Sequence, residues 1–139
     1  MNTEVLSRAW GYARFVASLA GAYFCRFVGG MDALVRALIA LSTLDYMSGV
    51  LVALIQKRLS SAVGFKGIAK KALVFVIVGA SSLTDSHVLG AGGALRGAVI
   101  GFYIANEALS LSENAALLGL PVPQRLKQAL EQLKDKGNR

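Results

Sequence analysis

The sequence predicts an all-α integral membrane protein that forms a single domain over residues 1–139. Hydrophobic residues make up 55% of the chain and charged residues only 17%, whereas soluble domains carry about 25% charged residues. The apolar residues occur in long blocks, and the basic residues that give the net charge of +7 lie beside those blocks. This placement is typical of the positive-inside rule and argues against a nucleic-acid partner. One cysteine and one histidine exclude an intrachain disulfide and a Cys/His metal site.

Residues 1–30 are predicted to form an amphipathic N-terminal helix, since they lack proline and divide into an apolar face and a small, polar face. The helix could lie flat at the membrane surface with its arginines toward the headgroups. Alternatively, residues 10–29 could cross the membrane, with the polar face turned to other helices or to water. The polar face carries Arg8, Arg14, Ser18 and Arg26, and Gly29 and Gly30 are predicted to form a hinge after it.

Residues 31–57 are predicted to form the first of three transmembrane helices. Their 23 mostly apolar positions from Ala33 to Ile55 cover about 34 Å at 1.5 Å per residue, which is enough for the hydrocarbon core. Asp32 and Arg36 lie one helical turn apart, so the sequence predicts an ion pair between them near the membrane edge.

Asp45 lies near the middle of this predicted span. An aspartate at that depth costs roughly 2.5–3.5 kcal/mol on translocon scales, so its side chain is expected to face other helices. Gly49 shares its face and allows close helix packing. Two interpretations of Asp45 stay open: a functional intramembrane carboxylate, or a structural group paired with a buried partner such as Arg96.

Residues 56–71 are predicted to form a basic cytoplasmic loop, because they hold five lysines and arginines and no acidic residue. Gly64 and Gly67 are expected to mark turns in it. Residues 72–89 form the second predicted transmembrane helix, in which Asp85 is expected to cap a helix end. Residues 90–93, with the sequence GAGG, are predicted to make a short external loop.

Residues 94–111 form the third predicted transmembrane helix, and the helix is expected to continue to a stop at Gly119, Pro121 and Pro123. Two stripes run along it. The small residues Gly97, Gly101 and Ala105 suit close helix packing. The polar stripe includes Arg96, Glu107 and Asn114, spaced for one helix face.

Residues 124–139 are predicted to be a cytoplasmic C-terminal helix and tail with one narrow apolar stripe. The basic loop and the C-terminus would then lie inside and the loop at 90–93 outside. The distribution of basic residues favours four spans, since a crossing by residues 10–29 would place the N-terminal arginines on the cytoplasmic side. The amphipathic pattern of residues 1–30 favours three.

Four motifs resemble those of the bacteriophage holin family, which also contains toxin-secretion holins. They are LDYMSG at 44–49, LSSAVGFKGIAKK at 59–71, FYIANEALSLSENAALLGLPVP at 102–123 and RLKQALEQLK at 125–134. The resemblance implies a protein of the bacterial cytoplasmic membrane that accumulates, oligomerises and opens a hole. The hole would release a passenger, either an endolysin for host lysis or a toxin. The family has neither a cofactor nor catalysis, so the chain is not expected to be an enzyme.

The polar stripes suggest how such a hole could form. Our hypothesis is that each monomer buries Asp45, Arg96, Glu107 and Asn114 among its own helices, and that these groups re-pair between subunits at high density. The resulting water-filled ring would be lined by them or by the arginine face of residues 1–30. An antiholin with the same fold is one alternative. A small proton-coupled transporter using Asp45 and Glu107 is a second, although no inverted repeats support it.

Overall fold

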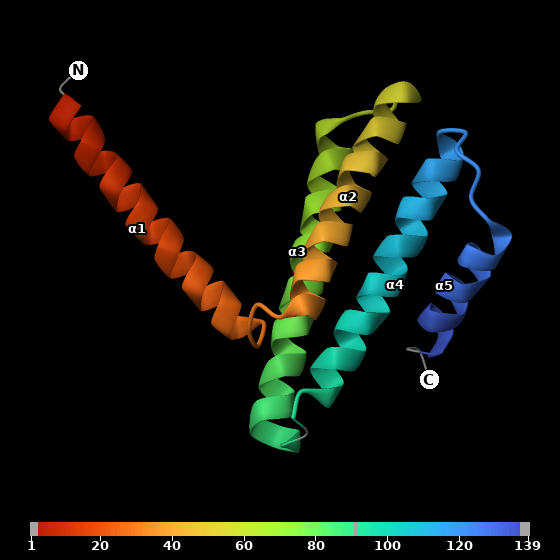
Figure 1. Ribbon diagram of the computed structural model, residues 1–139. Coiled ribbons are helices and arrows are strands. Elements are labelled where there is room, and N and C mark those ends of the chain that lie inside the picture. Colours follow the sequence, from red (N-terminus) through yellow and green to blue (C-terminus); the bar gives the residue numbers. More distant parts are fainter. Residues whose placement is uncertain (1–2, 91, 137–139) are drawn as a thin grey trace.

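The computed structural model describes residues 3–90 and 92–136, and this part of the chain is helical, without strands (Figure 1). The predicted all-α fold class is therefore confirmed. The predicted tail at residues 137–139 lies outside the described residues. The elements are α1 (Thr3–Phe27), α2 (Ala33–Ile55), α3 (Ser61–Thr84), the π-helix η1 (Asp85–Leu89), α4 (Ala94–Leu117) and α5 (Gln124–Lys136).

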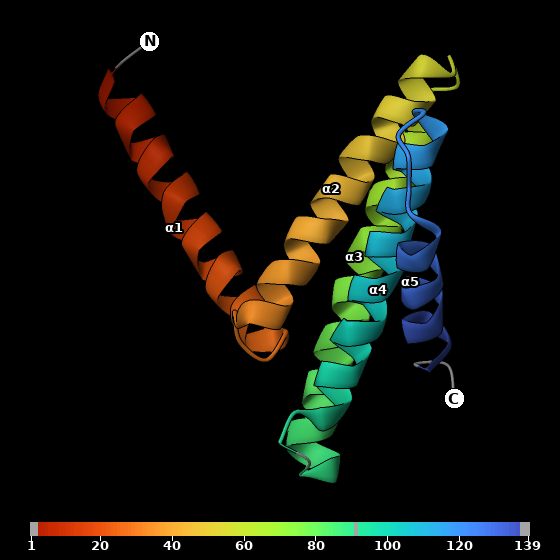
Figure 2. The ribbon, with the colours of Figure 1, turned by 45° about the vertical axis from the view of Figure 1, so that its right-hand side comes forward.

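Helices α2, α3 and α4 form a bundle in which α3 runs opposite to the other two (Figures 1 and 2). The most extensive packing joins α2 to α4, and α3 packs mainly on α4. Helix α5 folds back alongside α4, and it starts beside the middle of that helix (Figures 1 and 2). Helix α1 projects away from the bundle and touches it only near the hinge, where it packs on α3.

Helix α3 begins eleven residues earlier than the predicted second span, so the prediction of a basic loop over residues 56–71 was wrong. Ser60 caps the helix, because its hydroxyl accepts a hydrogen bond from the backbone N–H of Val63 at 3.3 Å. Only residues 56–60 connect α2 to α3. Gly64 and Gly67 are helical and leave room for the Tyr46 ring, which would lie 3.1 Å from a Cβ added at Gly67. The glycines thus serve packing between helices and do not make turns.

The hinge predicted at Gly29 and Gly30 is present. Both residues have positive φ, 82° and 106°, a conformation that favours glycine. Gly29 also lacks space for a side chain, since a Cβ there would lie 2.3 Å from the Ser82 hydroxyl oxygen. The amphipathic helix predicted for residues 1–30 is also observed, and none of the described residues of α1 is buried.

The expected stop of α4 is observed too. The helix continues six residues past position 111, to Leu117, and Gly119 then adopts a φ of 84°. The two prolines at 121 and 123 precede α5, which starts at Gln124 as predicted.

Two helical segments in the described part of the chain are long and apolar enough to cross a membrane. They are Ala33–Ile55, with a mean hydropathy of 1.9, and Ser61–Leu89, with a mean hydropathy of 1.6. Helix α4 is one residue longer than α2, but its polar stripe lowers its hydropathy. The two apolar segments support membrane insertion, while a third or fourth crossing belongs to the proposal below.

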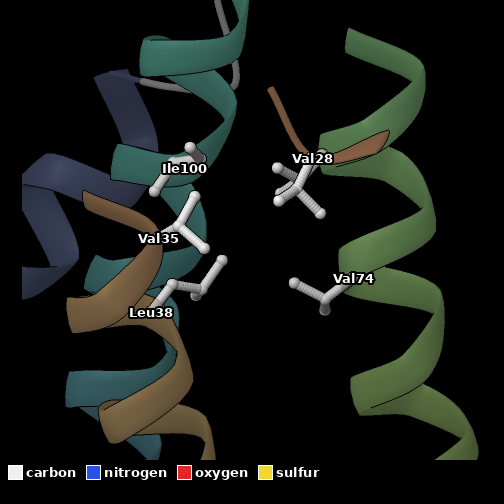
Figure 3. Close-up of a cluster of buried hydrophobic side chains, with 6 residues drawn as sticks. Val28, Val35, Leu38, Val74 and Ile100 are labelled. Carbon is white, nitrogen blue, oxygen red and sulfur yellow. The ribbon is translucent and has the colours of Figure 1, made fainter. Parts of the chain in front are cut away.

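The buried core is small and lies between the three bundle helices and the hinge. Figure 3 shows Val35 and Leu38 of α2 beside Ile100 of α4, with Val28 and Val74 facing them. Many large apolar side chains instead point outward. On α2 these include Leu44, Met47, Leu51 and Leu54. An apolar surface of this extent suits a lipid environment rather than water.

The glycines of α3 and α4 provide a matched test of this packing. A Cβ at Gly79 would lie 2.0 Å from the Phe27 ring, whereas no described atom lies within 4 Å of a Cβ at Gly97. We therefore expect Gly79→Ala to destabilise the α1–α3 contact by about 1–3 kcal/mol through overpacking. Gly97→Ala should leave the monomer unchanged or slightly stabilised. Unfolding of both variants in detergent checks this, and equal stabilities would contradict it.

Candidate functional site

A buried ionic cluster lies in the middle of the bundle, where α2, α3 and α4 meet. We call it the lysine cluster: Asp45, Ser48, Lys71, Glu107 and Asn114. The Lys71 ammonium donates to Asp45 Oδ2 at 2.6 Å and also to Glu107 Oε2. The Asn114 amide donates to Asp45 Oδ1 at 3.1 Å and to the Ser48 hydroxyl at 2.9 Å. Each helix of the bundle therefore contributes at least one polar group to one network.

The sequence places these groups together through helix periodicity. Glu107 and Asn114 are two turns apart on one face of α4, and Ser48 is one turn after Asp45 on α2. Burial is nearly complete for both acids, with exposed fractions of 8% for Asp45 and 2% for Glu107. Buried charges require partners, and Lys71 is the cation that both carboxylates share.

Two carboxylates around one ammonium leave the cluster with an excess of one negative charge when every group is ionised. Such a group of charges is held in place only while its partners are within reach, because removing a partner leaves an uncompensated charge in an apolar interior. Loss of Lys71 would therefore leave two buried carboxylates without a cation, so the stability of the bundle depends on this residue.

A second cluster joins the hinge to the N-terminus of α4. Its centre is Arg96, and we call it the arginine cluster. The guanidinium donates to the carbonyls of Val28 at 2.5 Å and Gly30 at 3.0 Å, and to Asp32 Oδ2 at 2.6 Å. The carboxylate of Asp85 accepts the backbone N–H of Arg96 at 2.7 Å, which caps α4. Asp85 is thus a helix-end cap, as predicted, but it caps the following helix.

Two hydrogen bonds to the Asp32 carboxylate lower its pKa below the ordinary value. The one from Arg96 has the larger effect, and the one from the backbone N–H of Val35 has the smaller effect. A lowered pKa means that the stabilisation from ionised Asp32 is present at neutral pH. It is lost as the pH falls through the acidic range, when the carboxylate takes up a proton.

The two clusters lie at opposite ends of an apolar layer. Thirteen residues separate Asp32 from Asp45 on α2, and eleven separate Arg96 from Glu107 on α4. At 1.5 Å per residue these helical stretches are about 16–20 Å long. The buried valines, Leu38 and Ile100 of the core occupy this layer. The layer is shorter than the roughly 30 Å hydrocarbon core of a bilayer.

A cavity of about 470 Å³ adjoins the lysine cluster on the side away from the arginine cluster. It is lined by α2, α3 and α4 and extends to Leu59 in the α2–α3 connection. Its polar lining includes Lys70 of α3 and Asn106 and Ser110 of α4, beside the members of the lysine cluster.

The structure brings together three of the polar residues predicted as a set and separates the fourth. Asp45, Glu107 and Asn114 belong to the lysine cluster, whereas Arg96 lies at the far end of the bundle. Arg96 is therefore not the partner of Asp45. The predicted Asp32–Arg36 ion pair was also wrong, since the Asp32 carboxylate binds Arg96.

Lys71 is the charged member of the lysine cluster that the sequence analysis does not identify, because the sequence predicts a loop at this position. The sequence does contain a signal for a helix that includes Lys71. Ser60 is a residue type that caps helix N-termini, and no proline between it and residue 71 would interrupt the helix. A helix that begins there brings Lys71 to the depth of Asp45, since α2 and α3 are antiparallel neighbours joined by a short connection.

The predicted packing residues divide into two groups. Gly49 packs on α4, since a Cβ there would lie 3.6 Å from Asn114 Nδ2, and Ala105 is buried with 3% exposed. Gly97 and Gly101 meet no described atom within 4 Å of an added Cβ, so this stripe stays open in the monomer. On the predicted polar face of α1, the side chains of Arg8, Arg14, Ser18 and Arg26 are exposed.

Helical structure, two apolar segments of spanning length and ionic groups buried between helices together define a small helical membrane protein. The sequence model of the bacteriophage holin family matches residues 22–135, and the chain belongs to this family. The match begins upstream of the quoted motifs and includes the end of α1. Membership supports a holin-like, non-enzymatic protein that associates with membranes.

Relatives in Clostridium, Listeria and Bacillus cover most of the chain. An uncharacterized 14.9 kDa protein in the nagH 3' region of Clostridium perfringens is 37% identical over 127 residues, which is 91% of this chain and 92% of the relative. An uncharacterized protein of Listeria monocytogenes is 41% identical over 110 residues, covering 79% and 78% of the two chains. The uncharacterized protein YtkC of Bacillus subtilis is 32% identical over 135 residues, covering 96% and 98%. No solved structure matches this chain.

Proposed function

We propose that this protein is a holin, which oligomerises in the bacterial cytoplasmic membrane and opens a hole for an endolysin or a toxin. Beyond family membership, one observation carries the proposal: α1 is an amphipathic helix of 25 residues with none of its described residues buried. Its apolar face includes Trp10 and Phe15, which are 69% and 63% exposed. A helix with this exposure requires lipid or another subunit on one face and water or polar groups on the other.

The proposed topology places the α2–α3 connection and the C-terminus in the cytoplasm. Lys57 and Arg58 lie in this connection, and Lys66 and Lys70 are exposed on the adjoining turns of α3. Helix α1 runs from the hinge back toward the same end of the bundle (Figures 1 and 2). A crossing by α1 would return the N-terminal arginines to the cytoplasmic side, so we favour four spans.

The lesion would form when the polar surfaces of several copies meet. The arginine face of α1 is costly against lipid and far less costly against water, so subunits gain by enclosing it. The open stripe of Gly97 and Gly101 on α4 lets neighbouring subunits approach closely. If Asp45, Glu107 and Asn114 exchange their partners within the monomer for partners in a neighbouring subunit, they add a second set of polar groups to the wall of the hole.

Expression of the chain alone in a bacterial host tests the proposal. A holin is expected to depolarise the membrane abruptly, to end growth, and to release cytoplasmic reporter proteins of graded size. An antiholin would accumulate in the membrane without either effect. Retention of every reporter at full membrane accumulation would contradict the proposal.

The carboxylates of the lysine cluster should set the time of lysis. Glu107→Gln leaves one carboxylate for Lys71 and removes the excess negative charge, so we expect a more stable monomer and later lysis. Asp45→Asn should also shift the timing, since it alters the contact with Asn114. Dye entry after induction measures both, with Glu113→Gln as a control for an exposed acid on the same helix. Unchanged dye entry in both variants would remove these carboxylates from the mechanism.

A further inference from the structure

The cavity beside the lysine cluster is open on one side, is lined by three helices and reaches the α2–α3 connection at the end of the bundle. Gly49 and Tyr46 of α2 line one side, and Gly67 of α3 lines another. The cavity extends from Leu59 in the α2–α3 connection to the level of Lys71. It thus leads from the proposed cytoplasmic surface toward the middle of the bundle, and its deep end coincides with buried charge.

The chemistry of the lining favours water as the occupant. Asn106, Ser110 and Asn114 of α4 supply amide and hydroxyl groups, and the lining holds two lysines and two carboxylates, whose charges balance. A lipid chain would offer no hydrogen bonds to the side chains of Lys70, Asn106 and Ser110, which lie outside the lysine cluster, and the balanced charge does not select an anion or a cation. The rest of the lining is apolar, with Val50, Val63 and Val74 among its members, and a cavity of this volume has room for on the order of ten water molecules around the polar groups.

We propose that this cavity is a water-filled vestibule that carries the cytoplasmic solution down to the lysine cluster. Each monomer would then separate the two aqueous phases only by the apolar layer between its two clusters. That layer is about 16–20 Å long by the helical rise, against roughly 30 Å for an intact hydrocarbon core. The proposal rests on the membrane insertion proposed above, but it does not depend on the size of the final hole.

Thiol labelling in the membrane tests the vestibule directly. Cys25→Ser provides a background without cysteine, since the chain has one cysteine. Ser110→Cys places a thiol in the vestibule, and Met47→Cys places one at a similar depth on the outward face of α2, where the native side chain is 61% exposed. A membrane-impermeant cationic methanethiosulfonate is added to inverted vesicles before lysis begins. Lys57→Cys serves as the positive control for insertion and orientation.

We expect the reagent to modify Ser110→Cys at least about tenfold faster than Met47→Cys, because thiolate formation requires water. Leu38→Cys, at a position that is fully buried in the apolar layer, should stay unmodified. If Lys57→Cys reacts while Ser110→Cys reacts no faster than Met47→Cys, lipid or protein fills the cavity and the vestibule is excluded. Release of reporter proteins, measured on the same variants, reports separately on hole formation.

Discussion

Lys71→Met is expected to destabilise the monomer by about 3–5 kcal/mol, since it leaves Asp45 and Glu107 buried without their shared cation. This is a large fraction of the stability of a small domain. Titration with sodium dodecyl sulfate in mixed micelles, followed by circular dichroism, measures the change. In cells, we expect the variant to accumulate poorly or to lose the timing of lysis.

Two further variants separate the ionic role of Lys71 from its packing. The triple variant Lys71→Met, Asp45→Asn, Glu107→Gln removes all three charges, and we expect it to recover most of the lost stability. Lys70→Met, which alters the exposed neighbour, should change stability by less than about 0.5 kcal/mol. A triple variant as unstable as the single one would show that the ion pairs do not hold the three helices together.

Arg96→Met is expected to free the hinge between α1 and α2. The guanidinium donates to two hinge carbonyls and to Asp32, and its loss should cost about 3 kcal/mol, the upper range for a hydrogen bond to a charged group. Amide hydrogen exchange in nanodiscs measures the effect, and we expect faster exchange over residues 28–32. The exchange rates at the centre of α2 should not change.

The matched variant for this test is Arg96→Lys. Lysine keeps the positive charge but cannot place three donors on Val28, Gly30 and Asp32 together, so it should restore only part of the protection. Arg36→Met should have little effect, because Arg36 is exposed and its Nε contacts only the backbone oxygen of Asp32 among the described residues. Full protection of the hinge in Arg96→Met would mean that the glycine conformations alone hold it.

Several features could be predicted from single stretches of sequence. Five of the helices, the glycine hinge after Val28 and the stop at Gly119 follow from apolar blocks, capping residues and breakers. The burial of Asp45 and Glu107 was also predictable, since an acid within an apolar block must face other helices. Family motifs then directed the interpretation toward holins.

The partners of the buried charges were decided by the tertiary structure. The sequence determined that Asp45, Arg96 and Glu107 need partners, because isolated charges are unstable in an apolar interior. It did not determine that Lys71 pairs with both acids, or that Arg96 binds the hinge and Asp32. Helix periodicity specifies which face a residue occupies, whereas the depth at which neighbouring helices meet depends on where each helix starts. Because α3 starts at Ser61, Lys71 lies at the same depth as Asp45 and Glu107, and the lysine cluster can form.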